Sequence, residues 1–376
     1  MLDRVIDRDR RTATESILRH YRERYLTHAV LVPNARFGLY AVAKELLRPG
    51  DRVIVSAITC RTVIQALLAA GSCPVLVDIE PATGNIDVGR LSNALLGTAR
   101  AIVTTNLYGN PDSVLDLKHI ADSRGLMLIE DCAHVLHTTV DGRPVGSVGD
   151  VSVFSFKKHF DEPGGAISLR NGDAARRVQA RVAAETFPPT ASEERSRYLQ
   201  FLVARCTSSS VAAHLSAVYT GLHRGPATRN GARSNDVVAS APPDIPPSLP
   251  LPTTAALLRV AAFLSRWEYL VCDRNAAARQ LIANCPLELK KSHHTQEVCY
   301  LVVPFFSSRR DSIVAAMKQR GIPTHFLYSP PMNEVFAELA SAWRLDTDRI
   351  GHWCRNILPI GLRFSRQYLE AIRSLS

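Results

Sequence analysis

Five short apolar runs, each rich in β-branched residues, are the feature that most restricts how this chain can fold. They are RVIVSA (52–57), PVLVDI (74–79), RAIVTTNLYG (100–109), LMLIEDCAH (126–134) and DVSVFSF (150–156). Runs of this length and composition predict β-strands. Because they are apolar on both faces, they are typical of parallel strands covered by helices. The sequence therefore predicts a three-layer α/β/α domain with a mostly parallel sheet.

Segments with helical spacing separate these strands. TVIQALLAAGS, VGRLSNALLGT and LDLKHIADSRG each repeat apolar residues at helical intervals and end near a small residue or glycine. A strand, a helix and a strand in turn are the pattern of parallel α/β units. No internal repeat at solenoid periods interrupts it.

The texture changes over 207–254, which is rich in proline, glycine and serine and weak in periodicity. This composition predicts a long loop or a partly disordered segment. We expect a large domain over 1–250, which contains that loop, and a small C-terminal α+β domain over 251–376. The expected elements of the small domain are a helix from Ala255 to about Ala283, the strand EVCYLVVPFF, the helix RRDSIVAAMKQRG, the strand IPTHFLY and a final helix from Arg366.

Bulk properties limit where the protein works. The chain has 376 residues, of which 46% are hydrophobic, so it can bury a large core. No apolar run is long enough to span a bilayer, and the charged N-terminus lacks the layout of a secretion signal. Its eight cysteines form no CxxC pair, which favours reduced packing residues over disulfides or metal ligands. We expect a cytoplasmic protein without a membrane segment or a metal site.

The net charge of +10 raises the question of an anionic partner. The arginines are dispersed and no basic face is interleaved with aromatic residues, so we do not expect nucleic-acid binding. An anionic small substrate or an ordinary solvated surface explains the charge. The pair His293–His294 is too isolated for a metal site, and we assign it no role.

Polar residues follow three of the predicted strands at their carboxyl ends, where parallel α/β sheets bind ligands. Thr59–Cys60 follow the first strand, Glu130–His134 end the fourth, and Ser155–His159 end the fifth. A carboxylate, an imidazole and a lysine thus converge on one edge. This set suits pyridoxal phosphate, whose aldehyde needs a lysine amine for a Schiff base and whose ring nitrogen needs an acid to stay protonated.

These residues carry a resemblance to a known family. The segments NARFGLYAVAKELLRPGDRVIVSAITC, NLYGNPDSVLDLKHIADSRGLMLIEDCAH, GRPVGSVGDVSVFSF and PGGAISL, and in the tail YLVVPFF, RGIPTHFLYSPP and RNILPIGL, occur in the family's order. The chain resembles the DegT/StrS-type aminotransferases, which are fold-type I pyridoxal phosphate enzymes. Members act mostly on nucleotide-linked keto sugars or on related cyclitols. The resemblance runs from about Leu31 to Arg170 and resumes in the tail.

The resemblance assigns roles to single residues. Asp131 matches the acid that pairs with the pyridine nitrogen, and His134 matches the glutamine or histidine near the phenolic oxygen. Ser155 matches a phosphate-binding serine, and a lysine shortly after it matches the one that forms the Schiff base. Both Lys157 and Lys158 stand there, and Lys158 fits the shorter spacing variants of the family better, so we predict that Lys158 holds the cofactor.

Three departures from the family pattern affect the predicted site. The Gly-Thr pair that cups the phosphate is Ala35–Arg36 here, where an arginine and a helix N-terminus would still favour an anion. The aromatic residue that often stacks on the ring is Cys60. The segment that supplies an asparagine across the dimer interface has no clean counterpart in 207–254.

Three functions stay open at this stage. The first is an aminotransferase with catalytic Lys158, Asp131 and His134, which acts as a homodimer on a keto sugar with a donor such as glutamate. The second is a dehydratase on the same cofactor, because sugar dehydratases of the family replace the lysine with histidine, and His159 follows the lysines. The third is a non-catalytic relative that serves as a binding module.

Overall fold

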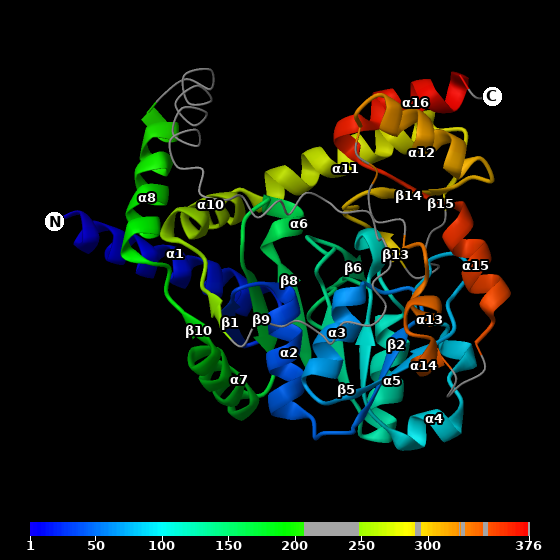
Figure 1. Ribbon diagram of the computed structural model, residues 1–376, viewed down its shortest axis with the longest axis horizontal. Helices are drawn as coiled ribbons and strands as arrows, with labels where there is room; N and C mark the ends of the chain where they lie inside the picture. The colour runs from blue at the N-terminus through cyan, green and yellow to red at the C-terminus, as the bar shows by residue number, and fades with distance from the viewer. Residues whose placement is uncertain (207–247, 290–294, 323, 325–327, 341–344, 375–376) are drawn as a thin grey trace.

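The structure, a computed structural model, describes residues 1–206, 248–289, 295–322, 324, 328–340 and 345–374 (Figure 1). Its centre is a seven-stranded sheet in the order β1-β9-β8-β5-β4-β2-β3. The five strands from β8 to β3 are mutually parallel, and β9 runs antiparallel to both of its neighbours. The strands are β1 His28–Val32, β2 Arg52–Ser56, β3 Cys73–Val77, β4 Ala99–Thr104, β5 Met127–Asp131, β8 Val151–Ser155 and β9 Gly165–Leu169.

The predicted mostly parallel sheet is confirmed, with two differences in the strands. The third predicted run ends early, because β4 stops at Thr104 and the chain then turns through Asn106 and Tyr108 in left-handed conformations. The fourth run likewise ends at Asp131 instead of His134. The strands β1 and β9, which were not predicted, extend the sheet beyond β8.

Helices cover both faces of the sheet and complete the three layers. One face packs against α2, α3 and α7 in a continuous apolar core. The other face packs against α4 and α5 under β2–β5 and against α1 and α10 near β8 and β9. The bounds are α1 Leu2–Arg24, α2 Ala35–Leu46, α3 Arg61–Ala69, α4 Asn93–Thr98, α5 Val114–Arg124, α6 Phe156–Phe160, α7 Gly172–Glu185, α8 Ala191–Cys206 and α10 Thr254–Leu264.

A second apolar core lies in the C-terminal part of the chain, at the upper right of Figure 1. There the antiparallel sheet β12-β14-β15 packs against helices, in agreement with the expected α+β texture. The longer elements of the C-terminal part of the chain are α11 Trp267–Asn284, β12 Glu288–Leu289, β14 Val303–Phe306, α12 Arg310–Gln319, α13 Met332–Val335, α14 Ala337–Ala340, α15 Thr347–Asn356, β15 Ile357–Ile360 and α16 Ser365–Ser374. Short elements complete the chain: β6 Thr139–Val140, β7 Arg143–Pro144, β10 Thr186–Phe187, β11 Leu249–Pro250, β13 Thr295–Glu297 and the 3-10 turns Val88–Arg90, Leu107–Gly109 and Leu362–Phe364.

Two predictions for the C-terminal part are wrong in detail. The single helix expected from Ala255 is two helices, because the chain bends at Ser265–Arg266, so α10 packs on α1 while α11 reaches the second core. The strand expected over EVCYLVVPFF is divided between the end of β13 and β14. Most of the predicted loop at 207–254, namely residues 207–247, lies outside the described residues. His293–His294 and part of IPTHFLY also lie outside them. The domain boundary near residue 250 stays a prediction.

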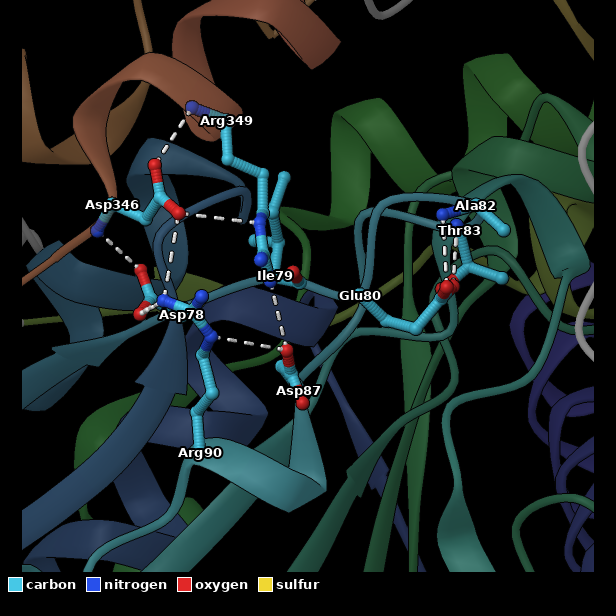
Figure 2. A network of polar contacts seen from close by, with 9 residues as sticks. All are labelled: Asp78, Ile79, Glu80, Ala82, Thr83, Asp87, Arg90, Asp346 and Arg349. Carbon is cyan, nitrogen blue, oxygen red and sulfur yellow. Dashed lines mark hydrogen bonds and ion pairs between the residues drawn. The ribbon is translucent and has the colours of Figure 1, made fainter.

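A cluster of charged side chains joins the end of β3 to the start of α15 (Figure 2). Arg90 pairs with Asp78 at 3.0 Å, and Arg349 pairs with Asp87 at 3.0 Å. The Asp346 carboxylate lies 3.5 Å from Arg90 and 3.4 Å from Arg349, and its backbone N–H donates to Asp78 at 2.7 Å. This clasp, made of Asp78, Asp87, Arg90, Asp346 and Arg349, attaches the C-terminal part to the edge strand of the large sheet.

No helix within the described ranges combines the length and the apolar character needed to cross a bilayer. The assignment to the cytoplasm stays a prediction.

Candidate functional site

Strand β5 ends in two carboxylates whose side chains leave the strand on opposite faces. The Glu130 carboxylate is fully buried and accepts three backbone N–H bonds from Gly146, Val148 and Gly149 at 2.6–2.9 Å. The Asp131 carboxylate accepts from the backbone N–H of Ala133 at 2.9 Å. Glu130 therefore holds the turn after β7 together, and Asp131 is the carboxylate at the predicted site.

Lys158 and Lys157 have different surroundings on the short helix α6 that follows β8. Lys157 is 68% exposed and forms an ion pair with Asp161 at 2.5 Å. Lys158 is half-buried, and this burial lowers its pKa, while Cys60 and Asp131 oppose the change. Of the two lysines, Lys158 is thus the one that lies with the predicted site residues.

Asp131 and Lys158 interact electrostatically across the ends of neighbouring strands. Burial raises the pKa of the Asp131 carboxyl to about 6, and the Ala133 N–H and the charge of Lys158 oppose this shift. Because the raised value still lies below neutral pH, the carboxyl is mainly ionised there. The arrangement places a carboxylate and an amine of lowered basicity side by side, which is the pair that sequence reasoning expected.

His134 lies at the same place, two residues beyond the start of the loop that follows β5. Its side chain is 6% exposed, and its Nδ1 accepts a hydrogen bond from the backbone N–H of Tyr108 at 3.1 Å. Burial, with a contribution from the charge of Lys158, lowers the pKa of His134 to about 3. The imidazole is therefore neutral at physiological pH.

The predicted phosphate-binding residues come together around the start of β9. Gly165 pairs with Ser155 on one side and with Val32 on the other. A Cβ on Gly165 would lie 2.4 Å from the carbonyl oxygen of Phe154 and 3.2 Å from the backbone nitrogen of Ala35. Gly165 thus lets the N-terminus of α2 approach the end of β8, and Ser155 and Ala35 share one corner of the site.

Arg36 follows in the first turn of α2 and is half-buried. The Asn34 side chain caps this helix by accepting from the N–H of Phe37 at 2.9 Å. No carboxylate in the described part of the chain pairs with Arg36. A guanidinium and a helix N-terminus at this corner favour an anion.

We expect Gly165→Ala to destabilise the protein by about 3 kcal/mol, because the new methyl group would collide with backbone atoms that cannot move independently. Urea unfolding of the cofactor-free protein measures the change. Gly97→Ala is the matched control, since a Cβ at Gly97 in α4 meets nothing within 4 Å. Equal unfolding midpoints for the Gly165→Ala variant and the wild type would contradict the close approach of α2 to β8.

Cys60 lies near Lys158, and Tyr328 lies near Cys60 and Asp131. Cys60 occupies the N-cap position of α3, and its Sγ lies 3.1 Å from the Thr62 hydroxyl. Tyr328 comes from the C-terminal part, with its ring 5.9 Å from that of Tyr108. Burial raises the pKa of Tyr328 well above its usual range, and Cys60, Tyr108 and Asp131 add to this effect. The C-terminal part therefore contributes an aromatic side chain near Cys60, which is the residue predicted to lie against the ring.

His159 follows Lys158 directly and lies between α11 and the site residues. Its side chain is 9% exposed, and its Nδ1 lies 3.1 Å from a guanidinium nitrogen of Arg274 on α11. Burial lowers the pKa of His159, and the charges of Arg274, His134 and Lys158 lower it further. His159 therefore contacts α11 and also lies near His134.

Sequence reasoning missed three contributors: Asn106, Tyr108 and Tyr328. All lie in segments that carried the family resemblance, NLYGN and RGIPTHFLYSPP, but nothing in their spacing distinguishes them from core residues. The signal that reveals all three is backbone conformation, because Asn106, Tyr108 and Tyr328 have φ values of 44°, 62° and 47°. Positive φ is uncommon in residues other than glycine.

With this geometry in place, comparison with known proteins shows which family the chain resembles. The model of the DegT/DnrJ/EryC1/StrS aminotransferase family matches residues 11–183, which include every predicted site residue. The match covers just under half of the chain. The resemblance found in the sequence is thus confirmed.

Relatives of known name match part of the chain. GDP-perosamine synthase of Vibrio cholerae is 32% identical over 149 residues, which are 39% of this chain and 41% of that protein. L-glutamine:2-deoxy-scyllo-inosose aminotransferase of Streptoalloteichus tenebrarius is 35% identical over 146 residues, 38% of this chain and 34% of that protein. The match therefore spans only about a third to two fifths of these DegT-family relatives.

Structural similarity covers more of the chain than sequence similarity does. The solved structure of DesV from S. venezuelae superposes with a TM-score of 0.67 at 20% identity, and covers 100% of this chain and 97% of DesV. At this identity the likeness concerns the fold alone. It confirms the predicted fold class, that of fold-type I pyridoxal phosphate transferases.

Proposed function

We propose that the protein is a pyridoxal phosphate-dependent aminotransferase that transfers an amino group to a keto sugar, nucleotide-linked or a related cyclic ketone. One observation carries this proposal. Lys158 and Asp131 lie at the carboxyl ends of adjacent strands and alter each other's pKa, inside the segment that matches the DegT family model. The relatives named above support the substrate class, because their names include a cyclitol aminotransferase.

The residues present fit the cofactor. Asp131 offers an ionised carboxylate for a protonated ring nitrogen, and Lys158 offers an amine whose lowered pKa leaves more of it uncharged at neutral pH. Ser155, the N-terminus of α2 and Arg36 surround the corner at Gly165 and would hold the phosphate dianion. Cys60 would lie against the ring where the family often has an aromatic residue.

Within the reaction, each of these groups has a physical task. Pyridoxal phosphate, when bound, supplies an electron sink for the carbon that loses a proton. The Lys158 Nζ binds the cofactor before the donor arrives, and afterwards takes and returns the proton at the reacting carbon. Asp131 keeps a positive charge on the ring nitrogen by its own negative charge. His134, neutral because of its burial, contributes a hydrogen bond and no charge.

The remaining parts of the proposal concern partners. A donor such as glutamate would supply the amino group, and the basic character of the chain suits an anionic acceptor such as a nucleotide-linked sugar. We propose a homodimer, without nucleic acid or membrane partners. In the family, a segment of one subunit completes the partner's site, and that segment has no clean counterpart in 207–254. Completion of the partner's site by 207–254 is therefore not part of this proposal.

The dehydratase alternative depended on His159. In the structure that imidazole contacts Arg274 and also lies near His134 and Lys158, but the charge that acts on Asp131 is that of Lys158. This arrangement supports the aminotransferase.

The decisive experiment is a half-reaction. Purified protein is loaded with pyridoxal phosphate, its visible absorption is recorded, and one equivalent of glutamate is added without a keto acceptor. We expect loss of the visible band and formation of about one equivalent of 2-oxoglutarate per cofactor, measured by mass spectrometry. A protein that binds no cofactor would support a non-catalytic relative instead. Cofactor bound without any visible lysine-linked band would favour the dehydratase.

A further inference from the structure

The loop after β4 has an unusual backbone. Asn106, Tyr108 and Gly109 have φ values of 44°, 62° and 89°, so three residues out of four are left-handed. For Tyr108 this conformation is unfavourable by its own sterics, and such residues persist only where their surroundings enforce them. A Cβ on Gly109 would lie 2.6 Å from the carbonyl oxygen of Cys299, so only glycine fits there. The loop is therefore held in one specific shape.

Hydrogen bonds from two buried side chains, Asn85 and Asp112, hold the loop in this shape. Asn85 accepts from the N–H of Leu107 at 3.2 Å and donates to the carbonyl of Pro111 at 2.9 Å. The Asp112 carboxylate accepts from the N–H groups of Ile86 and Thr105, at 3.2 and 3.3 Å. Asn85 and Asp112 are each 2% exposed. Hydrogen bonds of this kind are costly to leave unmade, so the loop conformation is strongly fixed.

The same loop holds the segment 131–138, which contains two of the predicted catalytic residues. The Asn106 side-chain amide donates to the Asp131 carbonyl at 3.0 Å. The Tyr108 backbone N–H donates to His134 Nδ1 at 3.1 Å, and the Thr138 hydroxyl donates to the Gly109 carbonyl at 2.9 Å. Three contacts thus fix the position of this segment on the end of β5.

The hydrogen bond from the Tyr108 backbone N–H determines which ring nitrogen of His134 carries the proton. A nitrogen that accepts from a backbone N–H bears no hydrogen itself, so the proton of the neutral ring is on Nε2. The ring also lies nearly parallel to that of Tyr108, with centroids 6.2 Å apart and 14° between the planes. The ring of Tyr108 is held in turn against Trp353 of α15 at 6.4 Å. Tautomer and orientation are therefore both fixed.

We propose that Asn106 and Tyr108 are positioning residues of the site, which hold His134 in the Nε2-protonated form so that it acts only as a hydrogen-bond donor. The ligand atom it suits is an anionic oxygen, such as the phenolate oxygen of pyridoxal phosphate. The identity of this ligand rests on the proposed function. The tautomer does not, because it follows from contacts within the chain.

The tautomer is tested on cofactor-free protein labelled with nitrogen-15 histidine. Signals of His134 are assigned by their disappearance in His134→Gln. At neutral pH we expect one unprotonated Nδ1 and one protonated Nε2, without averaging. A ring protonated on Nδ1, or an average of both forms, would overturn the proposal.

Two variants test the effect of the loop backbone on His134 separately from the effect of the Tyr108 ring. In Tyr108→Gly the left-handed backbone and its N–H remain, so the His134 signals keep their tautomer although the ring is lost. In Asn106→Ala the bond to Asp131 is lost and the left-handed turn is disfavoured, so the signals shift toward averaging. Signals that are unchanged in Asn106→Ala would show that this residue has no positioning role.

Affinity for pyridoxal phosphate tests the donor without depending on the folding of the loop variants. The amide nitrogen of glutamine mimics Nε2 of histidine, and that of asparagine mimics Nδ1. We expect His134→Gln to bind within a few-fold of the wild type and His134→Asn to bind about tenfold more weakly. The reverse order would refute the donor role of Nε2. If the wild type itself binds no cofactor, the proposed function fails, and the nitrogen-15 spectrum still decides the tautomer.

Discussion

Lys158→Ala is expected to abolish the visible absorption of the cofactor-loaded protein and to reduce transamination by roughly 10²–10⁴-fold or more, because the side chain both binds the cofactor and moves the proton. Lys157→Ala is the matched control. Lys157 is 68% exposed and paired with Asp161, so its loss leaves the band in place and weakens cofactor binding only modestly.

Absorbance spectra and borohydride reduction followed by peptide mapping measure this difference. The reduced cofactor should be found on Lys158 in the wild type and in the Lys157→Ala variant. A band that is lost in Lys157→Ala and kept in Lys158→Ala would move the role to Lys157. A band that survives both substitutions would show that neither lysine binds the cofactor.

Asp131→Asn is expected to have opposite effects on activity and stability. Activity falls by on the order of 10²–10³-fold, as when one charged group is removed from an active site, because an amide cannot keep the ring nitrogen charged. The cofactor-free protein becomes more stable at pH 8, by about 1–3 kcal/mol, because a buried charge is removed and the Ala133 N–H keeps an acceptor.

The pH dependence of this gain follows from the direction of the shift. The pKa of Asp131 is raised to about 6 in the folded state, against 3.8 ordinarily. Ionisation therefore destabilises the folded protein fully above pH 6, and the cost disappears as the pH falls toward 4. Urea unfolding of both proteins at pH 8 and pH 5 should show the difference shrink. A gain that does not depend on pH would contradict the assignment.

The neighbouring residue provides a control with the same chemistry. Glu130→Gln should lower the free energy of unfolding by about 1–3 kcal/mol, because its amide nitrogen would face the Gly146 N–H and leave that donor unpaired. This loss outweighs the relief of removing a buried charge. A stabilising Glu130→Gln would show that the three backbone bonds to Glu130 matter less than its burial.

These two carboxylates illustrate what the sequence could predict. Alternation along a strand indicates that Glu130 and Asp131 face opposite sides, but not which side carries the site. The family resemblance chose Asp131, and the structure places Glu130 among backbone N–H groups. The same holds for the two lysines, because the spacing from Ser155 favoured Lys158 whereas burial separates them.

Other parts of the fold could be predicted from the sequence to different degrees. The central parallel strands were predicted to within a few residues because long apolar runs have few alternatives. The strands β1 and β9 are five residues long, like most of the predicted strands, but they were missed. The bend between α10 and α11 depends on which core each helix packs against, and no local pattern at Ser265 records that choice. The loop at Tyr108 was missed for the same reason, since its shape depends on distant side chains such as Asn85.

The clasp between β3 and α15 has a consequence for recombining this chain with its relatives. Asp78, Asp87 and Arg90 come from one half of the sequence, and Asp346 and Arg349 from the other. A hybrid that exchanges only the C-terminal half would set foreign residues against three fixed charges, one of them an aspartate whose side chain is 6% exposed. The two parent proteins of a hybrid must therefore carry matching charges at these five positions. A hybrid without matching charges can fail to fold at the clasp even when its cofactor-binding half is intact.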